Sequence, residues 1–196
     1  MISLTPGSPG WARLILTRSR EKNKLTVPFL KRMTSLVEEI LASPGTWQLI
    51  TIESESDSIF AAGADMNELL ALSPESAAEY ARTGQTLMEL IEGSPIPVIA
   101  QVCGPCIGGG FDLAMSCHQI LATPEAVFAH PGVFLGIVTG FGGTVRLAEK
   151  VGQPEARQLM LTGRRIKGKE AFKMGLVHKL YSSGHAMRHD IRVNLV

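Results

Sequence analysis

Residues 97–102 form a nearly continuous apolar run, and this segment constrains the fold more than any other part of the sequence. A strand of this composition is buried on both faces, which is typical of a parallel sheet covered by helices. Two further apolar runs, at 12–16 and 49–52, are also predicted strands, and segments with helical spacing of apolar residues lie between them. Strands that alternate with helices indicate the α/β fold class.

The predicted helices have recognisable ends. Thr26 is expected to cap a helix whose first turn contains Pro28, and residues 43–45 end it. Ser73 and Pro74 begin a long helix that runs to about residue 92. Further helices are expected at 111–117, 144–151, 154–161 and 171–174, and further strands at 120–121, 127–128 and 176–177.

The composition is that of a single globular domain. The chain has 196 residues, of which 45% are hydrophobic and 19% charged, so it can bury a sizeable core. A net charge of +1 gives no global basic field, and no apolar run reaches the ~20 residues of a membrane span. We therefore expect no nucleic-acid partner and no membrane span. The three cysteines and the absence of a visible signal peptide predict a reducing, cytoplasmic setting.

Three segments rich in small residues are candidates for chemistry. Residues 60–66 would let the backbone approach a ligand closely, or would form only a tight turn after a strand. Residues 108–110 are three consecutive glycines before a helix, where free N–H groups and the helix dipole suit an oxyanion or a phosphate. A flexible loop is the alternative. The third segment, from 130 to 144, indicates only a loop with sharp turns when it is taken alone.

Taken in order, these segments resemble the enoyl-CoA hydratase/isomerase (crotonase) superfamily. The similarity runs from about Trp11 to Leu180 and also includes residues 21–25, 142–147, 161–166, 170–171 and 175–177. The resemblance implies a spiral of ββα units that binds acyl-CoA thioesters. Coenzyme A would be part of the substrate, and no separate cofactor or metal is expected. Family members form trimers or hexamers, so a homotrimer or hexamer is expected here.

The resemblance also implies residue roles. The backbone N–H groups of Ala64 and Gly109 would hold the thioester oxygen as it becomes an enolate. Substrate contacts are expected from Lys24, Ala62, Gly63, Ala64, Asp65, Met66, Gly109 and Gly132. The basic residues Arg18, Arg20, Lys22 and Lys24 would lie near the nucleotide of coenzyme A, or would form an ordinary solvated face.

The sequence departs from the hydratase pattern of two catalytic glutamates at both positions. Asp112 stands where the first glutamate is expected, and Gly132 stands where the second is expected. Asp112 is therefore the predicted acid/base, although it could instead be a solvated or capping residue. We expect an enoyl-CoA hydratase. Its hydration activity is in doubt because Gly132 has no side chain to act as the second acid. The alternatives are an isomerase that uses a single carboxylate, and a non-catalytic acyl-CoA-binding or assembly subunit.

Two histidine-containing patterns have competing interpretations. His130 could replace the missing acid or base, but a hydrogen-bonded structural histidine is the preferred reading. Cys103, Cys106 and His118 have metal-like spacing, yet a closed zinc site needs a fourth ligand and none is found. Buried apolar cysteines are preferred.

The sequence divides into a crotonase-like acyl-CoA-binding domain, residues 1–181, and an atypical tail, residues 182–196. The tail has no clear apolar period, so no structure is assigned to it. Family members continue with helices that cover the acyl pocket and help to build trimers. A shortened or altered C-terminal region is therefore expected, with apolar surface left exposed.

Overall fold

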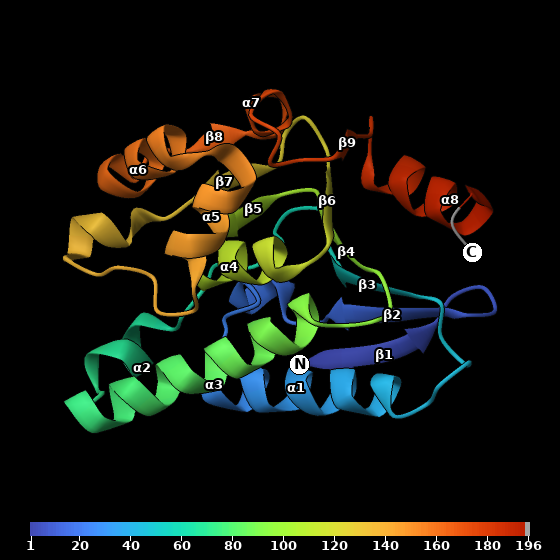
Figure 1. Ribbon diagram of the computed structural model, residues 1–196, viewed down its shortest axis with the longest axis horizontal. Coiled ribbons are helices and arrows are strands. Elements are labelled where there is room, and N and C mark those ends of the chain that lie inside the picture. Colours follow the sequence, from blue (N-terminus) through green and yellow to red (C-terminus); the bar gives the residue numbers. More distant parts are fainter. Residues whose placement is uncertain (195–196) are drawn as a thin grey trace.

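The predicted parallel strands form the centre of a six-stranded sheet in the computed structural model of the protein, which describes residues 1–194 (Figure 1). Only the edge pair β1–β2 is antiparallel, and the other neighbours are parallel. Every residue of β4 is buried, as its apolar sequence predicts. In sheet order, the strands are β1 (Ile2–Pro6), β2 (Trp11–Leu16), β3 (Leu49–Ser54), β4 (Val98–Val102), β6 (Gln119–Ala122) and β9 (Lys179–Leu180).

A second, three-stranded sheet contains β5 (Pro105–Ile107), β7 (Val127–Ala129) and β8 (Ile166–Lys167). The chain passes from β4 to β5 and then into α4 (Gly109–Ser116), and from β6 it passes to β7. Each turn thus adds one strand to each sheet, which is the expected spiral of ββα units. The sequence predicted β7 at 127–128 but did not predict β5 or β8.

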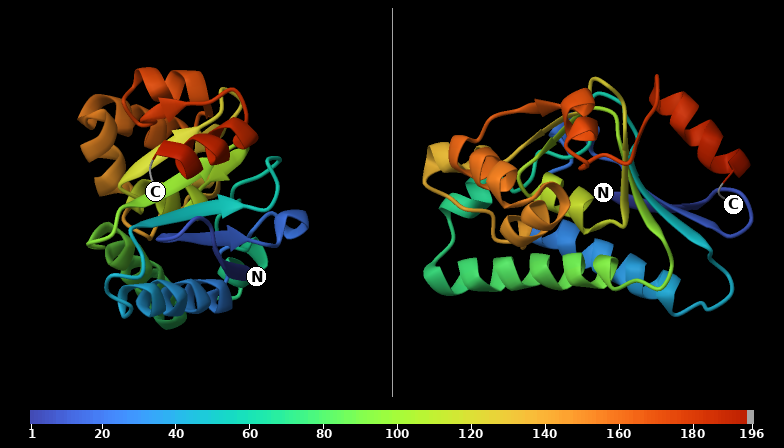
Figure 2. Two further views of the ribbon diagram at one scale, coloured as in Figure 1. Left: turned by 90° about the vertical axis from the view of Figure 1, so that its right-hand side faces the viewer. Right: turned by 45° about the horizontal axis from the view of Figure 1, so that its top comes forward.

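Helices α1 (Val27–Leu41) and α3 (Pro74–Glu92) pack side by side beneath the large sheet (Figures 1 and 2). Their predicted ends are confirmed. The Phe29 N–H donates to the Thr26 hydroxyl, 3.3 Å away, and Ser73 forms a capping box with Ser76. Buried side chains of both helices join the strands in one apolar core.

The C-terminal segment is helical, so the prediction of no structure there is wrong. Helix α8 (Gly184–Asn194) lies on the opposite side of the sheet from α1, where Met187 and Ile191 are fully buried. These two side chains are four residues apart and lie on one helical face. The few apolar residues of this largely polar segment are too sparse to reveal a period. The last two residues, 195–196, lie outside the described residues.

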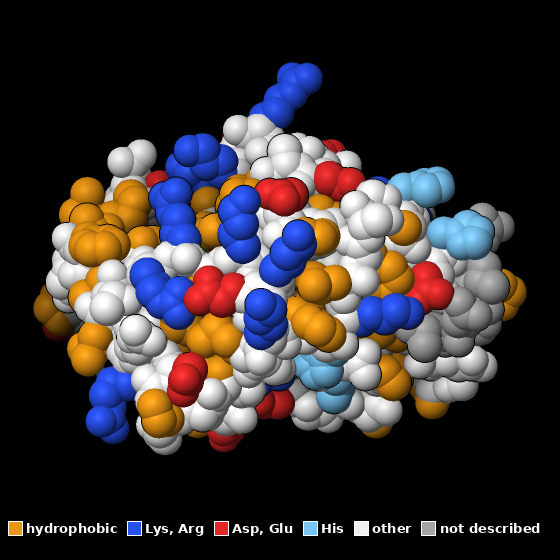
Figure 3. All heavy atoms as spheres, turned by 90° about the horizontal axis from the view of Figure 1, so that it is seen from above, with side chains coloured by type: hydrophobic (Ala, Val, Ile, Leu, Met, Phe, Trp, Pro, Cys, Tyr) orange, Lys and Arg blue, Asp and Glu red, His pale blue; other side chains and the backbone are white. Residues whose placement is uncertain are grey.

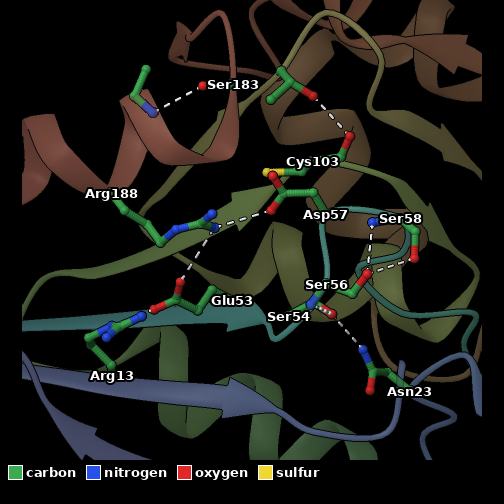
Figure 4. Close-up of polar contacts among 12 residues, drawn as sticks. Arg13, Asn23, Glu53, Ser54, Ser56, Asp57, Ser58, Cys103, Ser183 and Arg188 are labelled. Carbon is green, nitrogen blue, oxygen red and sulfur yellow. Dashed lines mark hydrogen bonds and ion pairs between the residues drawn. The ribbon is translucent and has the colours of Figure 1, made fainter. Parts of the chain in front are cut away.

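Polar contacts also fix α8. Figure 4 shows Arg188 reaching from this helix toward Asp57 and Glu53, at 3.2 and 3.9 Å. Glu53 is buried, and its other oxygen accepts a hydrogen bond from Arg13 at 2.7 Å. Position 184 must be small, because a Cβ atom there would lie 2.6 Å from both carboxylate oxygens of Asp57. The described part of the tail is therefore integrated into the fold.

The remaining helices connect these layers. They are η1 (Ser19–Glu21), α2 (Met66–Leu70), η2 (Pro131–Leu135), α5 (Gly143–Val151), α6 (Gln153–Thr162) and α7 (Gly168–Lys173). The strand expected at 176–177 is wrong. Leu176 and Val177 are buried, but both of their N–H groups donate to the carbonyl of Ala171. These two residues are apolar because they are buried, although they do not pair with a neighbouring strand. No helix within residues 1–194 is long and apolar enough to cross a membrane.

Candidate active site

Two of the segments predicted to carry chemistry meet in the structure. The Ile107 N–H donates to the carbonyl of Ala61 at 2.9 Å, which joins the chain after β3 to the chain before α4. A Cβ atom at Gly63, where φ is +83°, would lie 2.8 Å from the backbone nitrogen of Gly109. A Cβ atom at Gly110 would lie 2.5 Å from the Ala61 oxygen. Glycine is therefore required where the two backbones touch.

This contact brings two unpaired N–H groups into the same region. Among the described residues, neither the N–H of Ala64 nor that of Gly109 donates a hydrogen bond. Gly109 is the first residue of α4, so its N–H also lies at the positive end of the helix dipole. Ala64 adjoins Gly63, which touches Gly109. Such a pair of fixed donors can stabilise an oxyanion.

Asp112 lies in the first turn of α4, and its side chain has no solvent exposure. The Thr139 hydroxyl donates a hydrogen bond to its Oδ2 atom. Burial raises the pKa of Asp112 to about 7, although the Thr139 hydrogen bond and the Arg146 charge both act to lower it. A carboxyl group with a pKa in this range can exchange protons near neutral pH.

His130 lies against Asp112. Its Nε2 atom is 3.3 Å from Oδ1 of Asp112, and its ring stacks on Phe111 with centroids 4.8 Å apart. The two facing atoms are buried, and within residues 1–194 neither has a hydrogen-bond partner of good geometry. Nε2 of His130 makes no hydrogen bond of good geometry within this part of the chain, so the preferred reading of His130 as a hydrogen-bonded structural histidine is not confirmed. Burial lowers its pKa to about 4, so the ring is neutral at pH 7.

The loop before α5 closes over Asp112. Phe141 packs against Gly84 and contacts the Tyr80 ring in a tilted arrangement, with centroids 5.2 Å apart. A Cβ atom at Gly143 would overlap Oδ1 of Asp112, so glycine is needed for α5 to approach the carboxyl group. Arg146 holds the loop by donating to the Phe141 carbonyl at 2.7 Å. No local sequence pattern predicted that residues 139–143 would cover the acid/base candidate.

Gly132 lies in η2 and brings no side chain to the site. Its carbonyl accepts a hydrogen bond from the Ile137 N–H at 2.9 Å, so the segment folds back on itself. A Cβ atom at position 132 would lie 2.6 Å from the Ile137 oxygen. The backbone therefore leaves no room for a side chain where the second glutamate is expected.

The predicted basic cluster lines a cavity of about 310 Å³. Lys24 and Asp65 face each other there at 2.7 Å, and the Lys24 hydrogen bond lowers the pKa of Asp65. Ala62 is tied to the same region, because its N–H donates to the carbonyl of Lys22. Asp112 does not line this cavity, but Asp65, the next residue after Ala64, does. The lining residues are Met1, Arg18, Arg20, Glu21, Lys22, Lys24, Thr26 and Asp65.

Apolar side chains are exposed around η2 and α6. Phe134 is 74% exposed and Leu161 is 68% exposed. Figure 3 shows apolar side chains gathered over this end of the molecule, whereas charges of both signs are mixed over the middle of the same face. Met66, a predicted substrate contact, is also partly exposed at the start of α2.

Comparisons with known proteins agree with this geometry. The family model described as enoyl-CoA hydratase/isomerase matches residues 9–194. The structure of an enoyl-CoA hydratase from Bacillus anthracis superposes with a TM-score of 0.92 at 29% identity, and the match covers 99% of this chain and 74% of that one. The α/β spiral therefore has the form found in this class of enzymes. The chain belongs to the enoyl-CoA hydratase/isomerase family.

Two relatives extend the comparison. A crotonyl-CoA hydratase from Syntrophomonas wolfei subsp. wolfei is 40% identical over 169 residues, which is 86% of this chain and 65% of that protein. The fatty acid oxidation complex subunit alpha of Shewanella amazonensis is 39% identical over 158 residues, or 79% of this chain and 22% of that subunit. The chain thus spans less than two thirds of either relative.

Proposed function

We propose that this protein moves a proton on an acyl-CoA thioester through an enolate. The thioester oxygen would accept hydrogen bonds from the N–H groups of Ala64 and Gly109. The observation that carries this proposal is the backbone contact between Gly63 and Gly109, beside which two N–H groups lack acceptors within the described chain. Fixed donors favour the charge that develops on the oxygen, and removal of one such donor typically costs about 10²–10³ in rate.

Asp112 is the proposed acid/base. Its carboxylate would take a proton from a carbon of the acyl chain, and the electron pair of the broken C–H bond would pass into the enolate. Return of the same proton to a different carbon would shift the double bond, with no other reactant needed. Asp112 is fully buried beneath Thr139, so the proposal requires that the acyl group displace the Thr139 hydroxyl.

Isomerisation is the net reaction that this arrangement supports best. Hydration by two carboxylates needs a second acid, and the backbone at Gly132 has no space for one. A single carboxylate that removes and returns a proton is sufficient for isomerisation. Hydration is the second candidate, because a crotonyl-CoA hydratase is 40% identical to this chain.

The basic cavity is the proposed site for the nucleotide of coenzyme A. Arg18, Arg20 and Lys22 line it and can neutralise phosphate groups. Lys24 is already paired with Asp65, so its contribution would require exchange of that carboxylate for a phosphate. Asp65 lines the cavity and follows Ala64 directly in the chain, so a thioester joined to a nucleotide bound there could lie near the two N–H groups.

We also propose assembly as a homotrimer or hexamer in the cytoplasm. The exposed apolar side chains around η2 support burial against another subunit, and the three free cysteines fit a reducing compartment. Light scattering coupled to size exclusion should give a trimeric or hexameric mass. A monodisperse monomer would contradict the assembly proposal without affecting the proposed chemistry.

Mass spectrometry after incubation with a panel of enoyl-CoA thioesters in deuterated water tests the function. Deuterium uptake with a moved double bond would support isomerisation, and addition of water would support hydration. Either product would establish acyl-CoA chemistry without a carboxylate at position 132. If the folded protein changes no thioester but binds a non-reactive analogue in calorimetry, the catalytic proposal fails and an acyl-CoA-binding subunit replaces it.

A further inference from the structure

The contact between His130 and Asp112 has no role in a mechanism that uses the carboxylate alone. Nε2 and Oδ1 face each other at 3.3 Å, and both are buried without another hydrogen-bond partner in the described part of the chain. The second oxygen, Oδ2, already accepts a hydrogen bond from Thr139. Oδ1 is therefore the oxygen left for the imidazole ring, and a proton between the two atoms would satisfy both.

We infer that Asp112 and His130 form one acid–base unit that shares a proton between Oδ1 and Nε2. In this unit His130 is a positioning residue that acts through Asp112. The role of this unit in catalysis rests on the proposed acyl-CoA function, whereas the existence of the shared proton does not.

The fold holds the two side chains in place. The Gly108 N–H, just before α4, donates to the carbonyl of Ala129 at 2.9 Å, so the end of β7 is tied to the start of the helix that carries Asp112. The ring of His130 lies on Phe111, the neighbour of Asp112 on that helix. His130 is 7% exposed and Asp112 is fully buried, so the imidazole is the part of the unit that reaches the surface.

The surrounding charges leave one proton for the pair. Burial raises the pKa of Asp112 to about 7 and lowers that of His130 to about 4, so the pair holds one proton between these pH values. Arg146 on α5 favours the carboxylate, but it also pairs with Glu92 at 2.8 Å. On the β5 side, burial raises the pKa of the Cys106 thiol, so this group remains neutral.

The proton can then move in balanced steps. When the Asp112 carboxylate takes a proton from the acyl chain, an O–H bond forms as the C–H bond breaks. Because the acyl group replaces Thr139 at Oδ2, rotation of the carboxyl group must first turn this O–H bond toward His130. Transfer to His130 then breaks the O–H bond, forms Nε2–H and restores the carboxylate beside an imidazolium. The reverse steps return the proton to carbon. The unit would thus supply the second proton site that Gly132 cannot.

Carbon-13 NMR of aspartate-labelled protein tests the shared proton without any substrate. The Asp112 carboxyl signal, assigned by its loss in Asp112→Asn, is titrated in the wild-type chain and in His130→Gln. We expect its midpoint to fall by about one pH unit or more in His130→Gln, because the alternative proton site and the acceptor of its O–H bond are lost. His189→Gln, an exposed position on α8, should leave the midpoint unchanged. An unchanged or raised midpoint in His130→Gln would overturn the inference.

A second measurement covers the case in which His130→Gln does not fold. Nitrogen-15 spectra of labelled histidine should show Nε2 of His130 responding at the Asp112 midpoint in the wild-type protein and losing that response in Asp112→Asn. An identical response in both proteins would contradict the unit. If the coupling is present but no acyl-CoA exchanges a proton, the proposed function fails and the shared proton stands. If exchange occurs with the same pH profile in wild type and His130→Gln, the role of His130 in catalysis fails.

Discussion

The two halves of the candidate site differ in what builds them. The oxyanion half consists of backbone N–H groups at Ala64 and Gly109, beside the close contacts of Gly63 with Gly109 and of Gly110 with Ala61. The acid–base half consists of the side chains of Asp112, His130 and Thr139. The sequence matches the family pattern in the oxyanion half and departs from the family pattern in the acid–base half. Backbone N–H groups are positioned by the path of the chain. They can therefore be retained when substitutions alter the side chains that determine the net reaction.

Asp112→Asn should have the largest effect, because it breaks the side-chain half alone. Asparagine has nearly the same shape and cannot accept a proton in the same way, so proton exchange into an acyl-CoA should fall by about 10²–10⁴. Binding of a non-reactive acyl-CoA should be retained in calorimetry. The matched control is Asp57→Asn, on the side of the sheet covered by α8. An unchanged rate in Asp112→Asn would exclude Asp112 as the acid/base.

Gly63→Ala should break the backbone half. Its Cβ atom would lie 2.8 Å from the Gly109 nitrogen, so the two N–H groups would be displaced and exchange should fall by about 10²–10³. Gly45→Ala is the control. Gly45 has a similar φ of +78°, but a Cβ atom there meets nothing within 4 Å. Equal losses of exchange rate in the two variants, measured on folded protein, would show that backbone strain rather than the Gly63–Gly109 contact is responsible.

Gly132→Glu should not create a hydratase. The new Cβ atom would lie 2.6 Å from the Ile137 oxygen, so we expect a loss of about 1–3 kcal/mol in the free energy of unfolding and no gain in hydration. Denaturant unfolding and product analysis by mass spectrometry measure the two outcomes. A stable variant that hydrates an enoyl-CoA faster than the wild type would show that only the missing carboxylate limits hydration.

Thr139→Val should have the smallest effect and should change mainly the pH dependence. The Thr139 hydrogen bond favours the ionised form of Asp112, so its removal should raise the Asp112 pKa above about 7. Because the carboxylate is the base, the rise with pH of kcat/KM for exchange, which reports the free enzyme, should move to higher pH. Thr144→Val, at an exposed position on α5, should leave the profile in place. A shift to lower pH in Thr139→Val would contradict the assigned hydrogen bond.

Much of the fold could be predicted from local patterns. The caps at Thr26 and Ser73 were readable because a side-chain oxygen, a proline and an apolar period occur together. Strands β1, β5 and β8 and helix α8 were not readable. Their stability comes from pairing and packing with distant segments, such as β2 for β1 and the apolar outer residues Trp11 and Leu49 for α8.

The site was predictable only in part for the same reason. The glycine segments carry a local signal, because closely approaching backbones require glycine. The contact of Thr139 and His130 with Asp112 joins residues 27 and 18 positions apart along the chain, and no local pattern encodes it. The sequence identified Asp112 by resemblance, but its burial and its partners needed the three-dimensional structure.

The most direct test of the account is α-proton exchange of a saturated acyl-CoA in deuterated water, followed by mass spectrometry. A saturated chain cannot be hydrated or isomerised, so deuterium uptake reports enolate formation alone. The account predicts uptake by the wild-type protein well above the rate without enzyme, and its loss in both Asp112→Asn and Gly63→Ala. A folded wild-type protein that binds the thioester but incorporates no deuterium would contradict the claim that Ala64, Gly109 and Asp112 form a working enolate site.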